Sequence, residues 1–325
     1  MTRLTHSPKN GRSSLFDIDQ VVGDLAAVRH QWRSSQQRST EPGGRELPSR
    51  DALAKIISDL RGALFPMRLG PPELRQESED FYVGHTLDCA LHALLSQVRL
   101  ELGYAARFST KNSNQEILKE DRAIDIVREF SRALPAIRAL LDSDVISAYR
   151  GDPAAHSVDE VLLCYPGTLA MIHHRIAHQL HTLGVPLLAR IVAELAHGQT
   201  GIDIHPGASI GSGFFMDHGT GIVIGETAVI GQRVRIYQAV TLGAKRFPVD
   251  PDGKLQKGIA RHPIVEDDVV IYAGATVLGR VTIGRGAIIS GNVWVTTDVP
   301  PGGQVSQASL RHEQRSDQPE FSPAL

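Results

Sequence analysis

The sequence predicts an α+β chain in which an all-helical domain precedes a parallel β-helix built from six-residue repeats. The first observation behind this prediction is a change in composition: isoleucine and valine together number 8 in residues 1–100 but 26 in residues 201–300. The second is that 18 of the 30 glycines follow residue 200. Branched aliphatic residues and glycine favour short strands and tight corners, whereas the Leu, Ala, Arg and Glu of the first part favour helices.

The third observation is a six-residue period after Gly201, which matches neither the 3.6-residue period of a helix nor the two-residue period of a strand. The aliphatic repeat residues are Ile204, Ile210 and Met216, then, after a slip of two positions, Ile224, Ile230, Ile236 and Leu242, and, after an insert, Val265, Ile271, Val277, Ile283, Ile289 and Val295. The residue four positions later is uncharged in every case except after Leu242, where the insert begins. One such coil cannot bury its apolar side alone, so this period is typical of stacked coils in a solenoid.

We therefore expect four parts. Residues 1–50 form a weakly ordered N-terminal extension with room for a short amphipathic helix over 15–33. Residues 51–198 form the helical domain, in which Pro135 should bend or break one helix. Residues 199–303 form the β-helix with an inserted loop at 244–262, and residues 304–325 form a flexible C-terminal tail.

Composition excludes several classes of protein. With 34 Lys and Arg against 36 Asp and Glu, the net charge of −2 argues against a nucleic-acid partner. No apolar run reaches the roughly 18 residues that span a membrane. The basic start MTRLTHSPKNGRSS lacks the apolar segment of a signal peptide. Cys89 and Cys164 make no disulfide framework, so we expect reduced thiols in the cytoplasm.

Three polar clusters interrupt the repeat: Asp203 with His205, Asp217 with His218, and Arg261 with His262. A charged group beside the buried side of a coil is costly without a partner. Asp203 precedes His218 by 15 residues, which places the two on adjacent coils of 18 residues each. A carboxylate there would hold the imidazole in one tautomer and raise its basicity.

The segment DIHPGASIGSGFFMDHGTGIVIGETAVIG, followed by VTLGA and RHPIVED, closely resembles serine O-acetyltransferase, a family of hexapeptide-repeat acyltransferases. The upstream RGDPAA and RIAHQL resemble it too, so the likeness covers about residues 120–300. It implies that the β-helix is left-handed. It also implies transfer of acetyl from acetyl-CoA to the hydroxyl of L-serine, for cysteine biosynthesis, at sites between neighbouring subunits of a trimer.

The resemblance assigns roles to the residues that match the family motifs. His218 would be the general base that removes the proton of the serine hydroxyl, and Asp203 would orient it. Asp217 and Asp152 would hold the serine ammonium group, and Arg261 the serine carboxylate. This set suits a zwitterion, and the thioester is already activated, so direct attack without a metal or an acyl-enzyme suffices.

His262 would lie beside the reacting centre. The backbone of Gly243 and Ala244 would contact the pantetheine arm of CoA, and Lys245 would meet its negative charges. L-cysteine is a plausible inhibitor, because it shares the ammonium and carboxylate groups of serine. We expect a homotrimer or a dimer of trimers. Docking into cysteine synthase generally uses a terminal Ile in this family, whereas this chain ends at Leu325, so weak or absent complex formation is predicted.

Alternatives remain at this stage. The acceptor of the acetyl group is open to a close analogue such as homoserine, or to an amino sugar. A metal-dependent hydratase of the γ-carbonic anhydrase kind would use His205, His218 and His262 as ligands. A silent scaffold is a further alternative, which the intact polar set disfavours. The histidines at 174, 178 and 181 share one helical face, but no carboxylate stands at ligand spacing beside them.

Overall fold

A computed structural model describes residues 16–35, 47–106, 115–246, 250 and 253–307. Of residues 106 and 115–119 it describes the backbone alone. The chain divides into two compact units, 1–45 and 46–325, and each is described by itself. The first contains helix α1 (Ile18–Ser35), none of whose residues is buried. Among the described residues, no helix is both long and apolar enough to cross a membrane.

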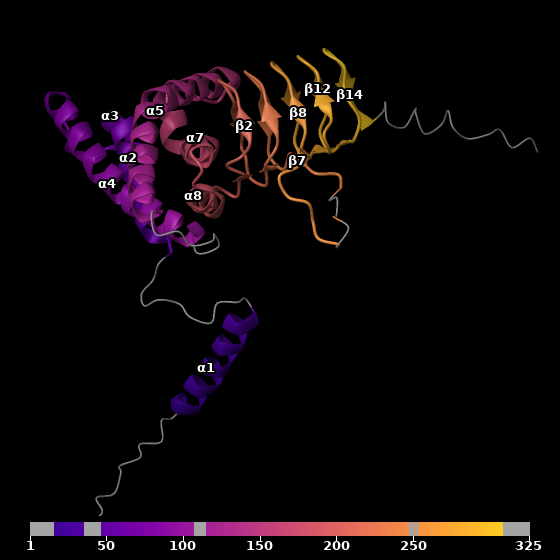
Figure 1. The fold of residues 1–325 in the computed structure, drawn as a ribbon. Coiled ribbons are helices and arrows are strands. Elements are labelled where there is room, and N and C mark those ends of the chain that lie inside the picture. Colours follow the sequence, from indigo (N-terminus) through magenta and orange to yellow (C-terminus); the bar gives the residue numbers. More distant parts are fainter. Residues whose placement is uncertain (1–15, 36–46, 107–114, 247–249, 251–252, 308–325) are drawn as a thin grey trace, which may run out of the picture. The chain divides into compact units, whose positions relative to one another are not determined.

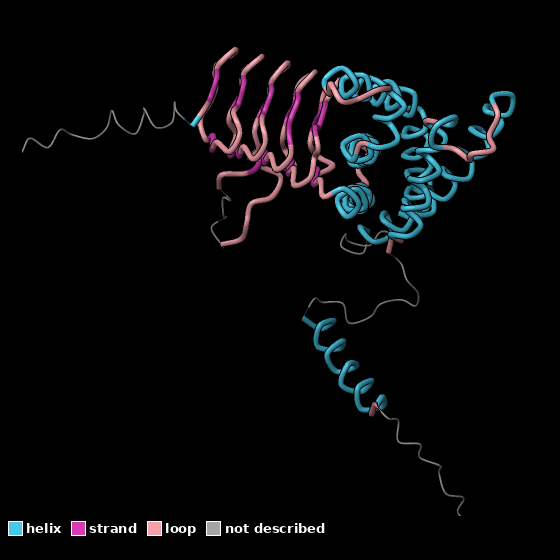
Figure 2. The backbone as a smooth tube through the Cα atoms, turned by 180° about the vertical axis from the view of Figure 1, so that it is seen from behind, coloured by secondary structure: helices cyan, strands magenta, loops and turns pink. Residues whose placement is uncertain are grey.

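The second unit begins with helices, which lie at one end of a stack of coils (Figures 1 and 2). These are α2 (Arg50–Leu64), α3 (Pro66–Leu69), the 3-10 turn η1 (Gln76–Ser78), α4 (Glu79–Ala106), α5 (Gln115–Gly151), α6 (Val158–Cys164), α7 (Pro166–Thr182) and α8 (Pro186–Thr200). Ser49 caps α2 by accepting a hydrogen bond from the Ala52 N–H, and proline opens α7 and α8, where its missing N–H costs nothing.

Pro135 does not break its helix, so that part of the prediction is wrong. Helix α5 runs through the proline without interruption. Proline inside a helix removes one hydrogen bond and costs about 3 kcal/mol. Leu134, Ile137 and Leu141 are all buried around it, with exposures of 5%, 4% and 1%. The core therefore holds the helix on both sides of the proline.

The coils form three parallel sheets of five, four and five strands, as the repeat predicts. The first sheet contains β1 (Asp203–Ile204), β4 (Val223–Ile224), β7 (Thr241–Gly243), β10 (Thr276–Leu278) and β13 (Trp294–Val295). The second contains β2 (Ser209–Ile210), β5 (Val229–Ile230), β8 (Ile264–Val265) and β11 (Thr282–Ile283). The third contains β3 (Phe215–Asp217), β6 (Arg235–Tyr237), β9 (Val270–Ile271), β12 (Ile288–Ile289) and β14 (Gln304–Val305). The predicted fold class is confirmed.

Each aliphatic repeat residue is buried inside the coils, from Ile204 to Val295. The position four residues after Met216 is an exception, because Thr220 there is exposed, and Ile222 fills the interior instead. The other departure is at the C-terminal end: Gln304 and Val305 pair with β12 as strand β14, although the sequence places them in the tail. Residues 308–325 lie outside the described part.

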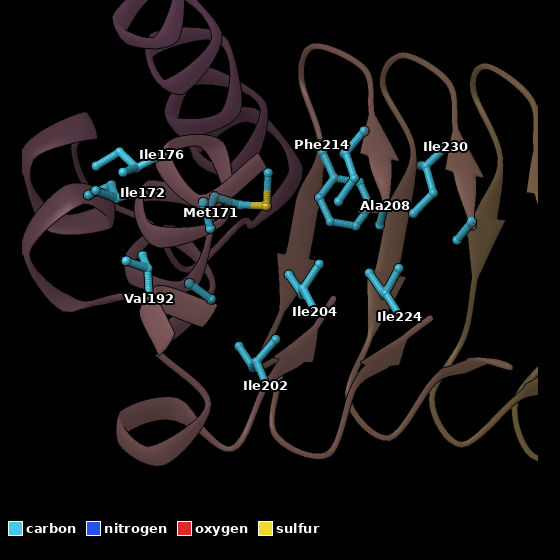
Figure 3. Packing of buried hydrophobic residues seen from close by; sticks show 14 of the residues in the cluster. Met171, Ile172, Ile176, Val192, Ile202, Ile204, Ala208, Phe214, Ile224 and Ile230 are labelled. Carbon is cyan, nitrogen blue, oxygen red and sulfur yellow. The ribbon is translucent and has the colours of Figure 1, made fainter. Parts of the chain in front are cut away.

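The helices pack directly on the first coil. Met171 and Val192, from α7 and α8, lie beside Ile204 and Phe214 in one apolar cluster (Figure 3). A buried ion pair supports this contact, in which Arg175 Nη2 donates a hydrogen bond to Asp144 Oδ1 at 3.0 Å. The pair also binds the first coil, and the helical part is thereby fixed against it.

Candidate active site

His218 occupies a corner that the two-residue slip in the repeat creates. Met216 and Ile224 are successive repeat residues eight positions apart, so the corner between β3 and β4 holds two more residues than a regular hexad. His218 adopts the left-handed backbone conformation there, with φ of 60°. Its side chain is 71% exposed in the single chain. The corner therefore presents the imidazole outward.

Asp217 lies beneath that imidazole, between it and the Arg235 guanidinium. Its Oδ1 is 3.7 Å from His218 Nε2, and its Oδ2 accepts a hydrogen bond from Arg235 Nη2 at 2.7 Å. The Arg235 guanidinium is itself held over the rings of Phe215 and Tyr237, at 5.0 and 4.7 Å from their centroids. Burying this carboxylate, with only 12% of its side chain exposed, is costly without such a partner.

Asp152 reaches the same corner from the helical part. Its Oδ2 accepts a hydrogen bond from Tyr165 Oη at 2.6 Å, and its Oδ1 accepts one from the Ala154 N–H at 2.8 Å. These two bonds lower the pKa of Asp152, and the positive charges of Arg235 and His218 lower it further. The same contact raises the pKa of Tyr165 to about 12. Asp152 is therefore an anion that interacts electrostatically with His218.

Two glycines make this approach possible. A Cβ on Gly151, at the end of α5, would lie 2.9 Å from the Phe215 ring, and one on Gly167, in α7, would lie 2.8 Å from the Met216 carbonyl oxygen. Any side chain at either position would push the helical part away from β3. The structure thus brings together three predicted residues, Asp152, Asp217 and His218.

Asp203 does not join this group through a direct contact. In the part of the chain that the structure describes, no hydrogen bond or ion pair links its carboxylate to His218. Its carboxylate lies instead with Glu194 and His197 of α8, and one ligand atom of each of the three falls within 4.8 Å of the others. The orienting role of Asp203 stays a prediction.

Arg261 and His262 lie at a different corner of the coil, between the first and second sheets. Arg261 Nη2 donates to Glu226 Oε2 at 2.7 Å. His262 Nδ1 accepts the Thr227 backbone N–H at 3.0 Å, so a neutral ring carries its proton on Nε2. Burial and the nearby Arg261 lower the pKa of His262 to about 4, which keeps the ring neutral.

The His262 ring rests on a glycine. A Cβ on Gly225 would lie 2.0 Å from His262 Cδ2, so no other residue at 225 leaves the ring in place. The described contacts of this corner do not reach His218 or Asp217, whose corner lies between the third and first sheets. One chain therefore carries two separate polar corners, one around His218 and one around His262.

The three residues expected to contact CoA follow one another at the end of β7, where the long loop begins. The Gly243 carbonyl accepts the Gly279 N–H at 2.9 Å, which continues the coil up to that point. Ala244 is half-buried, and Lys245 is exposed beside Gly279. Their position on the same side of the coil as His262 is compatible with the predicted role but does not test it.

The histidines proposed for a metal site do not meet in one chain. His205 lies at the His262 corner, where its Nδ1 accepts the Gly207 N–H at 3.0 Å, whereas His218 lies at the other corner. On α7, His174 is buried and His178 Nδ1 bonds the Pro206 carbonyl oxygen at 2.9 Å. Among the described residues, the one group of side chains with metal-ligand spacing is Glu194, His197 and Asp203.

Sequence reasoning missed Arg235 and Tyr165, which bind the two carboxylates at the His218 corner. It also missed Glu226 and Thr227, which bind Arg261 and His262. Arg235 had no simple signal, because the two-residue slip lengthens its coil and pairs it with Phe215, from where its side chain reaches Asp217. Tyr165 had no signal either, because its contact with Asp152 depends on how α5 and α7 pack. Glu226 and Thr227 occupy the corner one coil before the insert, where the returning loop covers them.

A family model described as bacterial transferase hexapeptide (six repeats) matches residues 262–297. This match falls on the second half of the coils, and the first half carries His218 with its carboxylates. Together the coils, the matched repeats and the polar corners define a hexapeptide-repeat acyltransferase.

Comparison of the whole chain narrows this class. A relative named serine acetyltransferase, plasmid, from Synechococcus elongatus is 51% identical over 322 residues, which cover 95% of this chain and 98% of the relative. The crystal structure of serine acetyltransferase 1 from Entamoeba histolytica with L-cysteine is 32% identical, with a TM-score of 0.66 over 88% of this chain and 99% of that one. Isoform 3 from the same organism, with cysteine, is 30% identical, with a TM-score of 0.65 over 93% and 96%. The chain belongs to the serine acetyltransferase family.

Proposed function

We propose that this chain transfers the acetyl group of acetyl-CoA to the hydroxyl of L-serine, giving O-acetylserine for cysteine biosynthesis. The observation that carries the proposal is the cluster of Asp152, Asp217 and His218, in which the Asp217 carboxylate lies 3.7 Å from an exposed imidazole and the Asp152 carboxylate interacts with it electrostatically. Two anions beside a base suit an acceptor that carries an ammonium group next to its hydroxyl.

His218 acts as the general base. It takes the proton of the serine hydroxyl while the oxygen attacks the thioester carbonyl carbon, and the C–S bond then breaks to release CoA, whose sulfur takes up a proton. A serine hydroxyl is a poor nucleophile at neutral pH, and a positioned base contributes roughly 10²–10⁴-fold. Asp152 and Asp217 hold the ammonium group, and Asp203 orients the His218 ring.

The part of the site around Arg261 and His262 comes from a neighbouring copy in a homotrimer. Arg261 then binds the serine carboxylate, and His262, neutral because its pKa is low, donates a hydrogen bond to the reacting centre from Nε2. Support comes from the exposure of His218, 71% in one chain, which leaves room for such a partner. Gly243, Ala244 and Lys245 contact acetyl-CoA beside His262.

L-cysteine inhibits by occupying the serine site, since it offers the same ammonium and carboxylate groups. Both Entamoeba histolytica relatives have been crystallised with cysteine, which supports this proposal. Two points stay predictions: the pairing of trimers into a dimer of trimers, and the weak binding to cysteine synthase. Leu325 lies outside the described residues.

The test is release of CoA from acetyl-CoA by the purified chain, with L-serine, homoserine and glucosamine compared as acceptors. We expect serine to be the preferred acceptor, and activity to be lost in His218→Ala. The matched control is His92→Ala, which removes an exposed histidine of α4 far from the coils. Equal turnover in His218→Ala and wild type would reject the mechanism, and preference for another acceptor would reject serine as the substrate.

A further inference from the structure

Helix α1 carries large apolar residues at alternating spacings of three and four: Ile18, Val21, Leu25, Val28 and Trp32. This is the a and d spacing of a coiled coil, in which one narrow apolar seam packs against the same seam of another helix. Val22 lies beside this seam at e and is the one further large apolar residue of the helix.

The seam is exposed along its length. Val21, Leu25 and Val28 at its centre are 46%, 50% and 62% exposed, and none of the helix's residues is buried. A continuous apolar surface of this kind marks a site of contact with protein. An isolated helix of this length is also only marginally stable in water, so packing of the seam would stabilise the helix itself.

The charges beside the seam favour another copy of the same helix in parallel orientation. With Leu25 at position a, Asp24 falls at g and Arg29 at the following e. In a parallel pair, g of one helix faces the next e of its partner, so Asp24 of each copy faces Arg29 of the other. An antiparallel pair brings g opposite g and loses this attraction.

We propose that α1 packs through Val21, Leu25 and Val28 against α1 of other copies of this chain, as a short parallel coiled coil. The proposal rests on the homotrimer proposed above. Two and a half heptads are short for an isolated coiled coil, but copies already joined through their coils hold their α1 helices at an effective concentration in the millimolar range.

Cysteine cross-linking of the full chain tests this arrangement. In a chain with Cys89→Ser and Cys164→Ser, Val28→Cys places thiols at d, where parallel neighbours meet. The control is Gly23→Cys, on the opposite face of the helix at f, where a side chain meets nothing within 4 Å. On mild oxidation we expect linked chains to form about tenfold faster at position 28 than at position 23. Equal rates, or no linkage at 28, would overturn the proposal.

A second measurement uses Trp32, with Trp294→Phe removing the other tryptophan. We expect Leu25→Asp to shift Trp32 emission to longer wavelength while acetyltransferase activity and the mass of the assembly stay unchanged. If α1 instead docks on its own chain, Leu25→Asp shifts the emission too, but no linkage forms at position 28. That combination of results would refute the proposal. Linkage does not depend on turnover, so failure of the proposed reaction would show separately, as an assembled chain without serine-dependent CoA release.

Discussion

Removing the Tyr165 hydroxyl should weaken serine binding without slowing the chemical step. The Tyr165→Phe substitution keeps the ring but deletes the 2.6 Å hydrogen bond to Asp152 Oδ2. This bond is the largest cause of the low pKa of Asp152, so its loss raises that pKa toward the ordinary value. The carboxylate also loses one of the two bonds that fix it beside Asp217 and His218.

The size of the effect follows from the hydrogen bond. Hydrogen bonds to charged groups contribute about 1.5–3 kcal/mol. Asp152 is only half-buried, so the lower end applies. About 1.5 kcal/mol corresponds to roughly a tenfold change in a binding constant. The bond is present with and without serine, so this figure is an upper limit, and we expect the KM for serine to rise by up to about tenfold, with kcat and the KM for acetyl-CoA little changed.

The assay is steady-state release of CoA with serine varied, and the control is Tyr149→Phe, an exposed tyrosine of α5. In an Asp152→Asn background the Tyr165→Phe substitution should add little, because the two residues act as one unit. Full additivity of the two substitutions, or an unchanged KM in Tyr165→Phe, would refute the assignment of Asp152 to the serine ammonium.

Three further outcomes are expected. Gly225→Ala puts a methyl group 2.0 Å from His262 Cδ2, so it should cost about 1–3 kcal/mol in unfolding free energy and most of the activity, measured by urea titration and CoA release; wild-type turnover would contradict this. The pKa of His262 is lowered to about 4, so the unfolded chain binds more protons below its ordinary pKa of about 6.5, and stability should fall as pH drops from 6.5 to 4. His262→Gln should flatten that part of the urea-midpoint profile, and an unaltered slope would show that other groups cause it. Gly167→Ala, with its methyl group 2.8 Å from the Met216 carbonyl oxygen, should lower thermal stability more than Gly84→Ala, an α4 position with nothing within 4 Å; equal melting temperatures would contradict the close approach.

The sequence predicted the coils well because each repeat residue is fixed by local spacing. Every aliphatic repeat residue from Ile204 to Val295 is buried, and the two-residue slip before Ile224 marks the corner that carries His218. The break at Pro135 was predicted wrongly, since buried neighbours on both sides outweigh the cost of proline. Helix propensity is local, whereas this compensation depends on tertiary packing.

The candidate site was predictable only in part. Asp217 and His218 adjoin in sequence, and the resemblance supplied Asp152, but the groups that set their charge are distant in the chain. Arg235 is one coil away from Asp217, and Tyr165 meets Asp152 only where α5 and α7 pack together. Such contacts depend on the approach of whole elements, which periodicity does not specify.

The most direct test of a site built from two copies is complementation between two inactive variants. His218→Ala and His262→Ala chains are each expected to lack activity when made alone, since each spoils one half of every site. If a site takes His218 from one copy and His262 from its neighbour, trimers co-assembled from equal amounts of the two variants should regain about a quarter of the wild-type activity. Mixed trimers that stay inactive would contradict a site shared between copies.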